Sequence, residues 1–281
     1  MSVGKIDLTA ITSSLTRRDD GIWVACEQRA VSYPDEGNDA CYLFEDDSFW
    51  FQHRNRVITE LVSRFSPQST FFDIGGGNGC VSNALQQAGI DTVLVEPGPA
   101  GARNARKRGL SNVIQSTLED AGFAERSISA AGVFDVVEHI EQHDHFISNL
   151  GRFLQPNGLL YITVPAFRFL WSFEDEYAGH FRRYTTRSLT ELLTRNGFTV
   201  NYCGYLFSFL LPPILLLRSI PCRLGLRKTV SVEVARKEHS GGSRITRQLT
   251  NSLLNRELHS IRRLKQIPFG SSCIAVATKT R

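Results

Sequence analysis

Short apolar runs alternate with helix-periodic stretches along most of the chain after residue 70. Runs rich in Val, Ile, Leu and Phe predict buried strands, at 70–74, 92–96, 112–115, 128–134, 159–164, 198–202 and 272–279. Apolar residues three and four positions apart predict helices between most of these strands, at 79–88, 99–108, 144–154 and 188–196. Because strands that alternate with helices form parallel sheets covered on both faces, we expect an α/β fold with a doubly wound, mostly parallel sheet of seven strands.

Two segments fall outside this alternation. Residues 1–45 show little periodicity, which predicts an irregular arm with one short strand. A helix should follow from Asp47 or Ser48, since either can cap its start, and Pro67 ends it. Residues 206–270 form a helical insertion between the last two strands, apolar at first and amphipathic over 243–264. We expect residues 1–66 to be an arm and helix that cover the ligand site, and residues 67–281 to be the main domain.

The composition indicates a globular chain in a reducing compartment. The 281 residues are 42% hydrophobic, and the net charge of +4 is too weakly basic to indicate a nucleic-acid partner. The six cysteines form neither a CxxC pair nor a zinc spacing, so we expect a cytoplasmic protein without a metal centre. The N-terminus lacks the apolar core of a signal peptide. The longest apolar run, residues 205–217, is shorter than the about 20 residues that span a bilayer.

A glycine cluster follows the first strand of the main domain, in the sequence FFDIGGGNG. Glycine weakens strands and helices, so such a cluster indicates a sharp turn or a backbone that approaches a ligand closely. A dinucleotide motif would require a small residue at position 80 or 82, where Cys80 and Ser82 stand, and no phosphate-loop Gly-Lys-Ser/Thr occurs. The spacing is instead an acid, Asp73, followed by glycines at alternate positions. Glu96 ends the second strand, where a carboxylate can accept hydrogen bonds from ribose hydroxyls.

This pattern resembles motif I of the class I S-adenosylmethionine-dependent methyltransferases, which have a Rossmann-like fold. Two further landmarks agree: the pair Glu138-His139 after the fourth strand, and the turn Pro156-Asn157-Gly158 before the fifth. The resemblance covers residues 71–202 and is nearest to the small-molecule type, including the ubiquinone-biosynthesis O-methyltransferases. It implies S-adenosyl-L-methionine as cofactor. It also implies a set of cofactor-binding residues: Arg54, Asp73, Gly75, Gly77, Gly79, Glu96, Pro97, Thr117, Leu118, Glu119 and Asp135. Thr117 stands where the family usually carries an aspartate.

Methyl transfer from a sulfonium depends on positioning and on the exclusion of water, and a base helps when the acceptor is a hydroxyl. His139 and His180 are the catalytic candidates, because histidine titrates near neutral pH; each could instead only orient or pack its loop. Substrate candidates are the aromatic and basic residues of the loop after the fifth strand, Phe167, Trp171, Arg183 and Tyr184.

The sequence therefore predicts a methyltransferase for a small-molecule or lipid-linked acceptor, with oxygen as the methylated atom. One alternative is a methyltransferase-like binding module without catalysis. Another is an NAD-dependent oxidoreductase, which Cys80 and Ser82 disfavour. The insertion is either a cap over the acceptor or a membrane-facing patch. In the second case, apolar residues of 206–228 would contact a membrane beside basic side chains, namely Arg218, Arg223, Arg227 and Lys228.

Overall fold

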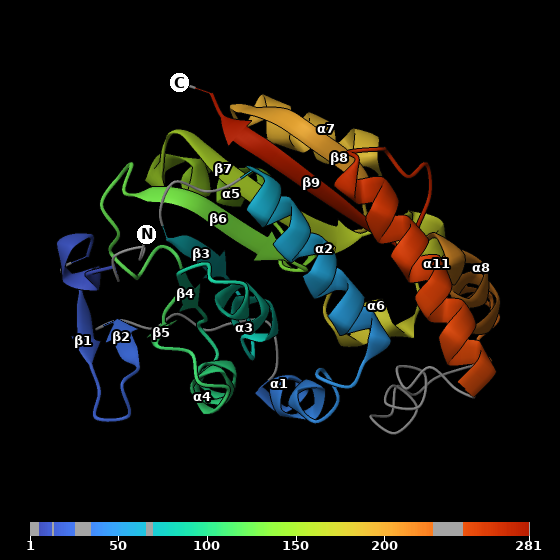
Figure 1. Cartoon of the computed structure of the whole chain (residues 1–281), viewed down its shortest axis with the longest axis horizontal. Helices are drawn as coiled ribbons and strands as arrows, with labels where there is room; N and C mark the ends of the chain where they lie inside the picture. The colour runs from blue at the N-terminus through green and yellow to red at the C-terminus, as the bar shows by residue number, and fades with distance from the viewer. Residues whose placement is uncertain (1–5, 13, 26–34, 66–69, 227–243, 281) are drawn as a thin grey trace.

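The computed structural model describes residues 6–12, 14–25, 35–65, 70–226 and 244–280. A single nine-stranded sheet forms its centre, in the order β1-β2-β5-β4-β3-β6-β7-β9-β8 (Figure 1). The seven predicted strands are all present, as β3 (Phe71–Ile74), β4 (Thr92–Val95), β5 (Asn112–Gln115), β6 (Ile128–Phe134), β7 (Leu154–Pro165), β8 (Phe198–Leu206) and β9 (Ser272–Lys279). The predicted number of seven was wrong, because β1 (Leu15–Arg17) and β2 (Trp23–Ala25) form a hairpin that extends the sheet at β5.

The sheet is mostly parallel, and its strand order reverses at β3. This strand pairs in parallel with β4 on one side and with β6 on the other, so that Asp73 lies opposite both Leu94 and Gly132. The strand β9 is antiparallel to its neighbours β7 and β8. In sheets of this kind, a crevice opens beyond the carboxyl ends of the strands where the order reverses. The site is therefore expected beyond Ile74 and Phe134.

The predicted helices are present, with ends shifted by one or two residues. They are α2 (Phe49–Phe65), α3 (Cys80–Gln87), α4 (Pro99–Lys107), α5 (His143–Phe153), α7 (Thr186–Arg195) and α11 (Arg244–Arg262). The sequence analysis missed α1 (Asp35–Tyr42) and α6 (Phe173–Tyr177), as well as the short 3-10 turns η1 (Leu8–Ala10), η2 (Val137–His139) and η3 (Arg168–Leu170). The described residues before position 45 thus contain more regular structure than the predicted irregular arm with one short strand.

The helices cover both faces of the sheet, as predicted. Phe71 packs with α2, α3 and α11 on one face, while its neighbour Phe72 packs with α5 on the other. Successive side chains of a strand point to opposite faces, and because both faces are covered, every residue of β3, β4 and β6 is buried. Figure 1 shows α2 and α11 side by side over one face, and each contributes buried side chains to the same core.

Two predictions about the second half of the chain need correction or completion. The strand β7 begins at Leu154, five residues earlier than predicted, because the Pro156-Asn157-Gly158 segment lies within the strand at a shift of register. The insertion begins with η4 (Ser208–Leu210), α8 (Leu211–Ile214), η5 (Leu215–Ser219) and α9 (Ile220–Arg223), and it ends with α11. Arg227 and Lys228 lie outside the described residues. Among the residues that are described, no helix is both long and apolar enough to cross a membrane.

Candidate functional site

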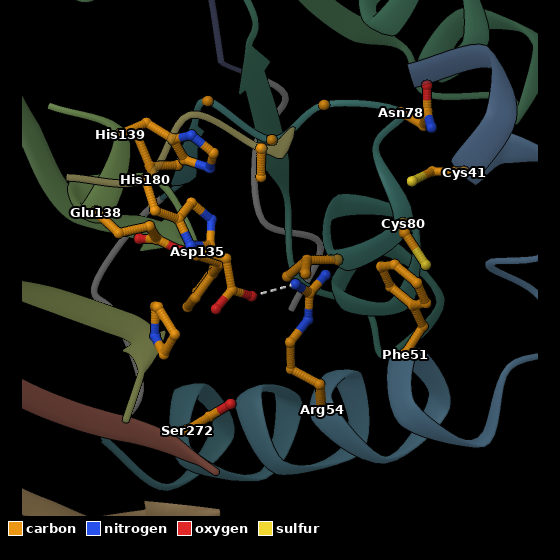
Figure 2. A pocket seen from close by; sticks show the side chains of 18 of the residues that line it. Cys41, Phe51, Arg54, Asn78, Cys80, Asp135, Glu138, His139, His180 and Ser272 are labelled. Atoms are coloured by element: carbon orange, nitrogen blue, oxygen red, sulfur yellow. Dashed lines mark hydrogen bonds and ion pairs between the residues drawn. The ribbon is translucent and has the colours of Figure 1, made fainter. Parts of the chain in front are cut away.

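A cavity of about 950 Å³ lies where the carboxyl ends of β3, β4 and β6 meet the N-terminal helices and the insertion. Of the predicted cofactor-binding residues, all but Gly79 line it, and so do His139, His180 and Arg183. Figure 2 shows Arg54 on α2 opposite a group formed by Asp135, Glu138, His139 and His180. The cavity therefore joins the expected cofactor residues and the expected catalytic residues in one space.

The glycine loop after β3 is fixed by its backbone conformation. Gly75 and Gly77 have φ angles of +70° and +55°, in the region that favours glycine. A Cβ on Gly75 would lie 2.8 Å from Val136, whereas one on Gly77 would meet nothing closer than 3.6 Å. The loop thus needs glycine for its shape, and at Gly77 it leaves room for a ligand.

Gly79 has a different position from the one predicted. It caps the start of α3 with a φ of +74°, and a Cβ there would lie 2.5 Å from Leu110. Gly79 does not line the cavity. A Cβ there would also lie 3.1 Å from Ala105 of α4, so the structure gives this glycine a role in packing α3 against α4.

Asp73 is a buried acid near the end of β3, and one of its carboxylate oxygens is hydrogen-bonded. Its Oδ2 accepts a hydrogen bond of 2.7 Å from Ser82 Oγ, while its Oδ1 has no partner among the described residues. Burial raises the pKa of Asp73 to about 6, although the Ser82 hydrogen bond opposes this. An unpaired oxygen at the wall of the cavity fits a ligand that brings a hydrogen-bond donor.

Glu96, at the end of β4, holds the glycine loop by its carboxylate. Its Oε2 accepts a hydrogen bond of 2.8 Å from the Gly77 amide, and its Oε1 accepts one of 2.7 Å from the Gly98 amide. Each carboxylate oxygen can accept more than one bond, so a pair of ribose hydroxyls fits this group. The wall continues through Pro97, Ser116, Thr117, Leu118 and Glu119.

Arg54 reaches the cavity from α2 and forms an ion pair with Asp135 (Figure 2). Its guanidinium lies over the rings of Trp50 and Phe51, at 4.8 and 5.1 Å from their centroids. The resemblance implied that Arg54 meets the cofactor carboxylate, and its Nε has no partner among the described residues. Asp135 follows β6 with a φ of +58°, a conformation that costs energy for a residue other than glycine.

Two imidazoles stand side by side in the cavity. The ring centroids of His139 and His180 are 4.6 Å apart, edge to face. Burial lowers the pKa of His139 to about 4, and the neighbouring His180 adds to this effect. His180 Nδ1 lies 2.8 Å from an oxygen of Asp175, which is fully buried on α6. His139 is thus neutral at pH 7, whereas His180 is paired with a carboxylate.

Asp175 was missed by the sequence analysis, although the chain carries a signal for it. Ser172 and Asp175 form a capping box at the start of α6, and S-x-x-D is a known sequence pattern for such a box. Arg183 binds the same carboxylate, with Nε 2.7 Å from Oδ1 and a terminal nitrogen 2.9 Å from Oδ2. Arg183 therefore lines the cavity and also holds the Asp175 carboxylate in place.

Glu138, His139 and His180 bring three side chains of metal-ligand type together. One donor atom from each lies within 4.8 Å of the others. Glu138 is buried, its Oε2 has no partner among the described residues, and burial together with the charge of Asp135 raises its pKa well above the ordinary value. One carboxylate with two imidazoles can hold a divalent cation. The sequence analysis expected no metal centre, because it considered only cysteine pairs and zinc spacings. Glu138 and His180 are far apart in the chain and form no such local pattern.

The opposite wall of the cavity is apolar. The insertion contributes Leu210, Pro213, Ile214 and Leu217, and the start of α2 contributes Phe49 and Trp50. None of these side chains was predicted as a site residue.

Three of the four predicted substrate residues do not line the cavity. Tyr184 is 3% exposed, lies in the core, and pairs its hydroxyl with His143 Nδ1 at 2.7 Å. Phe167 stacks on Tyr205, with ring centroids 4.8 Å apart. Trp171 also lies outside the lining residues, and only Arg183 is in the predicted place.

The reversed strand order, the glycine loop and the acid at the end of β4 together define a Rossmann-like nucleotide site of the methyltransferase kind. A profile of the family described as methyltransferase domain matches residues 50–202, which is more than half of the chain. The chain therefore belongs to this family, and its domain is a class I S-adenosylmethionine-dependent methyltransferase domain. The family cofactor fits the unpaired oxygen of Asp73 and the cradle between Gly77 and Glu96.

Individual proteins agree with this membership. A probable S-adenosylmethionine-dependent methyltransferase of Mycobacterium tuberculosis is 25% identical over 162 residues, which are 56% of this chain and 59% of that protein. A ubiquinone biosynthesis O-methyltransferase of Rickettsia felis is 24% identical over 133 residues, 43% of this chain and 54% of that protein. The chain thus matches less than two thirds of the length of these curated relatives.

Solved structures share the fold. Phosphoethanolamine N-methyltransferase 2 of Haemonchus contortus, solved with S-adenosyl-L-methionine, has a TM-score of 0.54 at 17% identity and covers 89% of this chain and 58% of that one. A methyltransferase of Thermotoga maritima has a TM-score of 0.50 at 19% identity, with 83% of this chain and 93% of that one covered. At these identities the likeness concerns the fold alone.

Proposed function

We propose that this chain transfers the methyl group of S-adenosylmethionine to a hydroxyl of a small-molecule or lipid-linked acceptor with an apolar body. This proposal rests on one continuous cavity, which is lined by the glycine loop, the two imidazoles and the apolar side chains of the insertion. Its volume of about 950 Å³ lies near the upper end of the range for ligand pockets. It therefore has room for an acceptor beside the cofactor.

His180 is the proposed general base. The bound cofactor supplies an activated methyl group. The chain holds the reactants in position, excludes water and supplies a proton acceptor. His139 is a poor base because burial holds its pKa near 4. His180 is 15% exposed in its side chain and lines the cavity. The ubiquinone biosynthesis O-methyltransferases among the relatives support oxygen as the methylated atom.

The lining of the same cavity suggests separate roles for the N-terminal segment and the rest of the chain. Asn38, Cys41 and Phe44 line it from α1 and the turn after it, and Trp50 and Arg54 line it from α2. We propose that residues 1–66 are the cover of the cofactor site, and that residues 67–281 are the methyltransferase domain with its cap.

An apolar tail on the acceptor is expected to raise the rate. Two phenols that differ only by an alkyl chain of about four carbons should differ about 100-fold in kcat/KM, because each buried CH₂ contributes about 0.8 kcal/mol. Radiolabelled methyl transfer measures both rates. Ile214→Asp should remove the preference for the tail and leave S-adenosylhomocysteine binding unchanged. Equal rates for both phenols would contradict an apolar acceptor site.

We also propose that the insertion contacts an anionic lipid surface. Leucines of the segment are exposed by 60% to 75%, namely Leu216, Leu217, Leu224 and Leu226. Leu217 also lines the cavity, so an apolar acceptor could pass from a membrane into the site. Arg223 lies among these leucines and adds positive charge.

This contact predicts sedimentation with vesicles. The protein should sediment with vesicles of phosphatidylglycerol, and less with phosphatidylcholine alone, in a salt-dependent manner. The double variant Leu224→Glu/Leu226→Glu should reduce the bound fraction several-fold, because each Leu loses about 1.5–3 kcal/mol of burial. Leu249→Glu, at an exposed site on α11, is the matched control. Unchanged sedimentation of the double variant would rule out this surface.

A further inference from the structure

We propose that Asp175 is a positioning residue that holds His180 in the tautomer whose Nε2 takes the proton of the acceptor hydroxyl. This inference rests on the proposed function, since it assigns a role within the same site. It concerns a residue that was not among the predicted site residues.

The hydrogen bond between the two side chains fixes the tautomer. His180 Nδ1 lies 2.8 Å from Asp175 Oδ1. An ionised carboxylate only accepts hydrogen bonds, so Nδ1 must be the nitrogen that carries the hydrogen. In the neutral ring the free lone pair is then on Nε2. Both His180 and Asp175 line the cavity, and the lone pair is thereby available to a ligand.

Asp175 is itself held in place from several sides. Arg183 donates to both of its oxygens, at 2.7 and 2.9 Å, and the Ser172 amide donates to Oδ2 at 2.8 Å. The His180 amide donates at 2.9 Å to the Asp175 carbonyl, which closes the loop between them. Burial alone would raise the pKa of Asp175, but the hydrogen bonds from His180 and Arg183 outweigh it and leave the pKa lowered. The carboxylate is therefore ionised and rigid.

The acceptor O–H gives its proton to Nε2 while an oxygen lone pair forms the bond to the methyl carbon. The carbon–sulfur bond breaks with its electron pair staying on sulfur, which leaves a methyl ether and a neutral thioether. Asp175 stabilises the imidazolium, which then loses the proton to water. His139, 4.6 Å away between ring centroids, stays neutral and does not oppose this charge.

Nitrogen-15 NMR of histidine-labelled protein tests the tautomer directly and needs no acceptor. In the wild type, the His180 signals, assigned by their loss in His180→Gln, should show a protonated Nδ1 and an unprotonated Nε2. In Asp175→Asn the ring should change to a mixture or to the other tautomer, because one amide oxygen cannot serve both Arg183 and His180. A wild-type ring protonated on Nε2 would overturn the proposal, even if Asp175→Asn does not fold.

Kinetics test the consequence. Asp175→Asn should lower kcat about 100-fold, the lower end of what a general base contributes, with KM for S-adenosylmethionine unchanged. The double variant with His180→Gln should be no slower than His180→Gln alone, since the two residues act as one unit. Glu176→Gln, at an exposed carboxylate of the same helix, should keep the wild-type rate. A rate within twofold of wild type in Asp175→Asn would overturn the proposal.

Two further outcomes separate this inference from its basis. If the wild type does not bind S-adenosylhomocysteine, the proposed function is wrong, but the tautomer of His180 can still be measured. If Zn²⁺ shifts the Nε2 signal and a chelator abolishes methyl transfer, His180 is a metal ligand with Glu138 and His139, and the role as base is excluded.

Discussion

Replacing Glu96 with alanine is expected to weaken S-adenosylhomocysteine binding by at least about 100-fold. We expect Glu96 to bind the ribose, so the variant should lose two charge-assisted hydrogen bonds, each contributing about 1.5–3 kcal/mol. It also frees the Gly77 and Gly98 amides, which the carboxylate now holds at 2.8 and 2.7 Å. The glycine loop is then no longer fixed toward β4. Isothermal titration calorimetry measures the loss.

Glu96→Gln and Glu191→Ala are the matched comparisons. Glutamine keeps one oxygen, so its loss should be smaller than that of alanine. Glu191 lies on the exposed face of α7 and pairs only with Arg187 among the described residues, so its replacement should leave the affinity unchanged. Full affinity in Glu96→Ala would show that the cofactor does not bind at the end of β4.

Replacing Glu257 with alanine should lower the free energy of unfolding by about 3–5 kcal/mol, the usual effect of breaking a buried pair. Glu257 on α11 is 5% exposed. Its Oε1 accepts from the Phe207 amide at 2.8 Å and pairs with His53 Nε2 at 2.9 Å. Its Oε2 accepts from the amide and the hydroxyl of Ser208. One carboxylate thus joins α2, α11 and the start of the insertion.

Urea denaturation, read by circular dichroism, measures this effect, and Glu60→Ala at a surface pair with Arg262 is the control. The loss should also depend on pH. Burial would raise the pKa of Glu257, but His53 and the two amides outweigh it and lower the pKa below 4.5. The stabilisation is therefore complete above pH 4.5 and is lost as the pH falls through the folded-state pKa. A loss in Glu257→Ala no greater than in Glu60→Ala would contradict this account.

The parts of the fold that could be predicted are those set by local constraints. Each strand of the main sheet is a short apolar run, and the glycine loop combines a positive φ at Gly75 with an open Cβ position at Gly77. Both leave a trace in a few consecutive residues. For the hairpin of β1 and β2, the sequence predicted only one short strand without its place, because strands of three residues are too short to show a period.

The acceptor side of the site depended on contacts between distant segments. The sequence placed Phe167 and Tyr184 on a loop near the chemistry, but a loop aromatic can turn into the core, and both do so here. A loop brings Arg183 next to Asp175, and no periodic pattern in the sequence predicts the conformation of that loop. For the insertion, the sequence left two alternatives open, a cap over the acceptor or a membrane-facing patch, because an apolar run does not show which surface it packs against.

The insertion places the proposed acceptor contacts on a different segment of the chain from most of the cofactor contacts. Asp73 and Glu96 lie on or directly after strands, whereas the wall proposed to meet the acceptor comes from Leu210 to Leu217, which belong to no strand. Glu257 fastens the root of this segment at Phe207 and Ser208. We therefore expect that exchanging residues 210–217 would change which acceptors are methylated and would leave the methyl-donor site intact, which makes this stretch the first target for redesign.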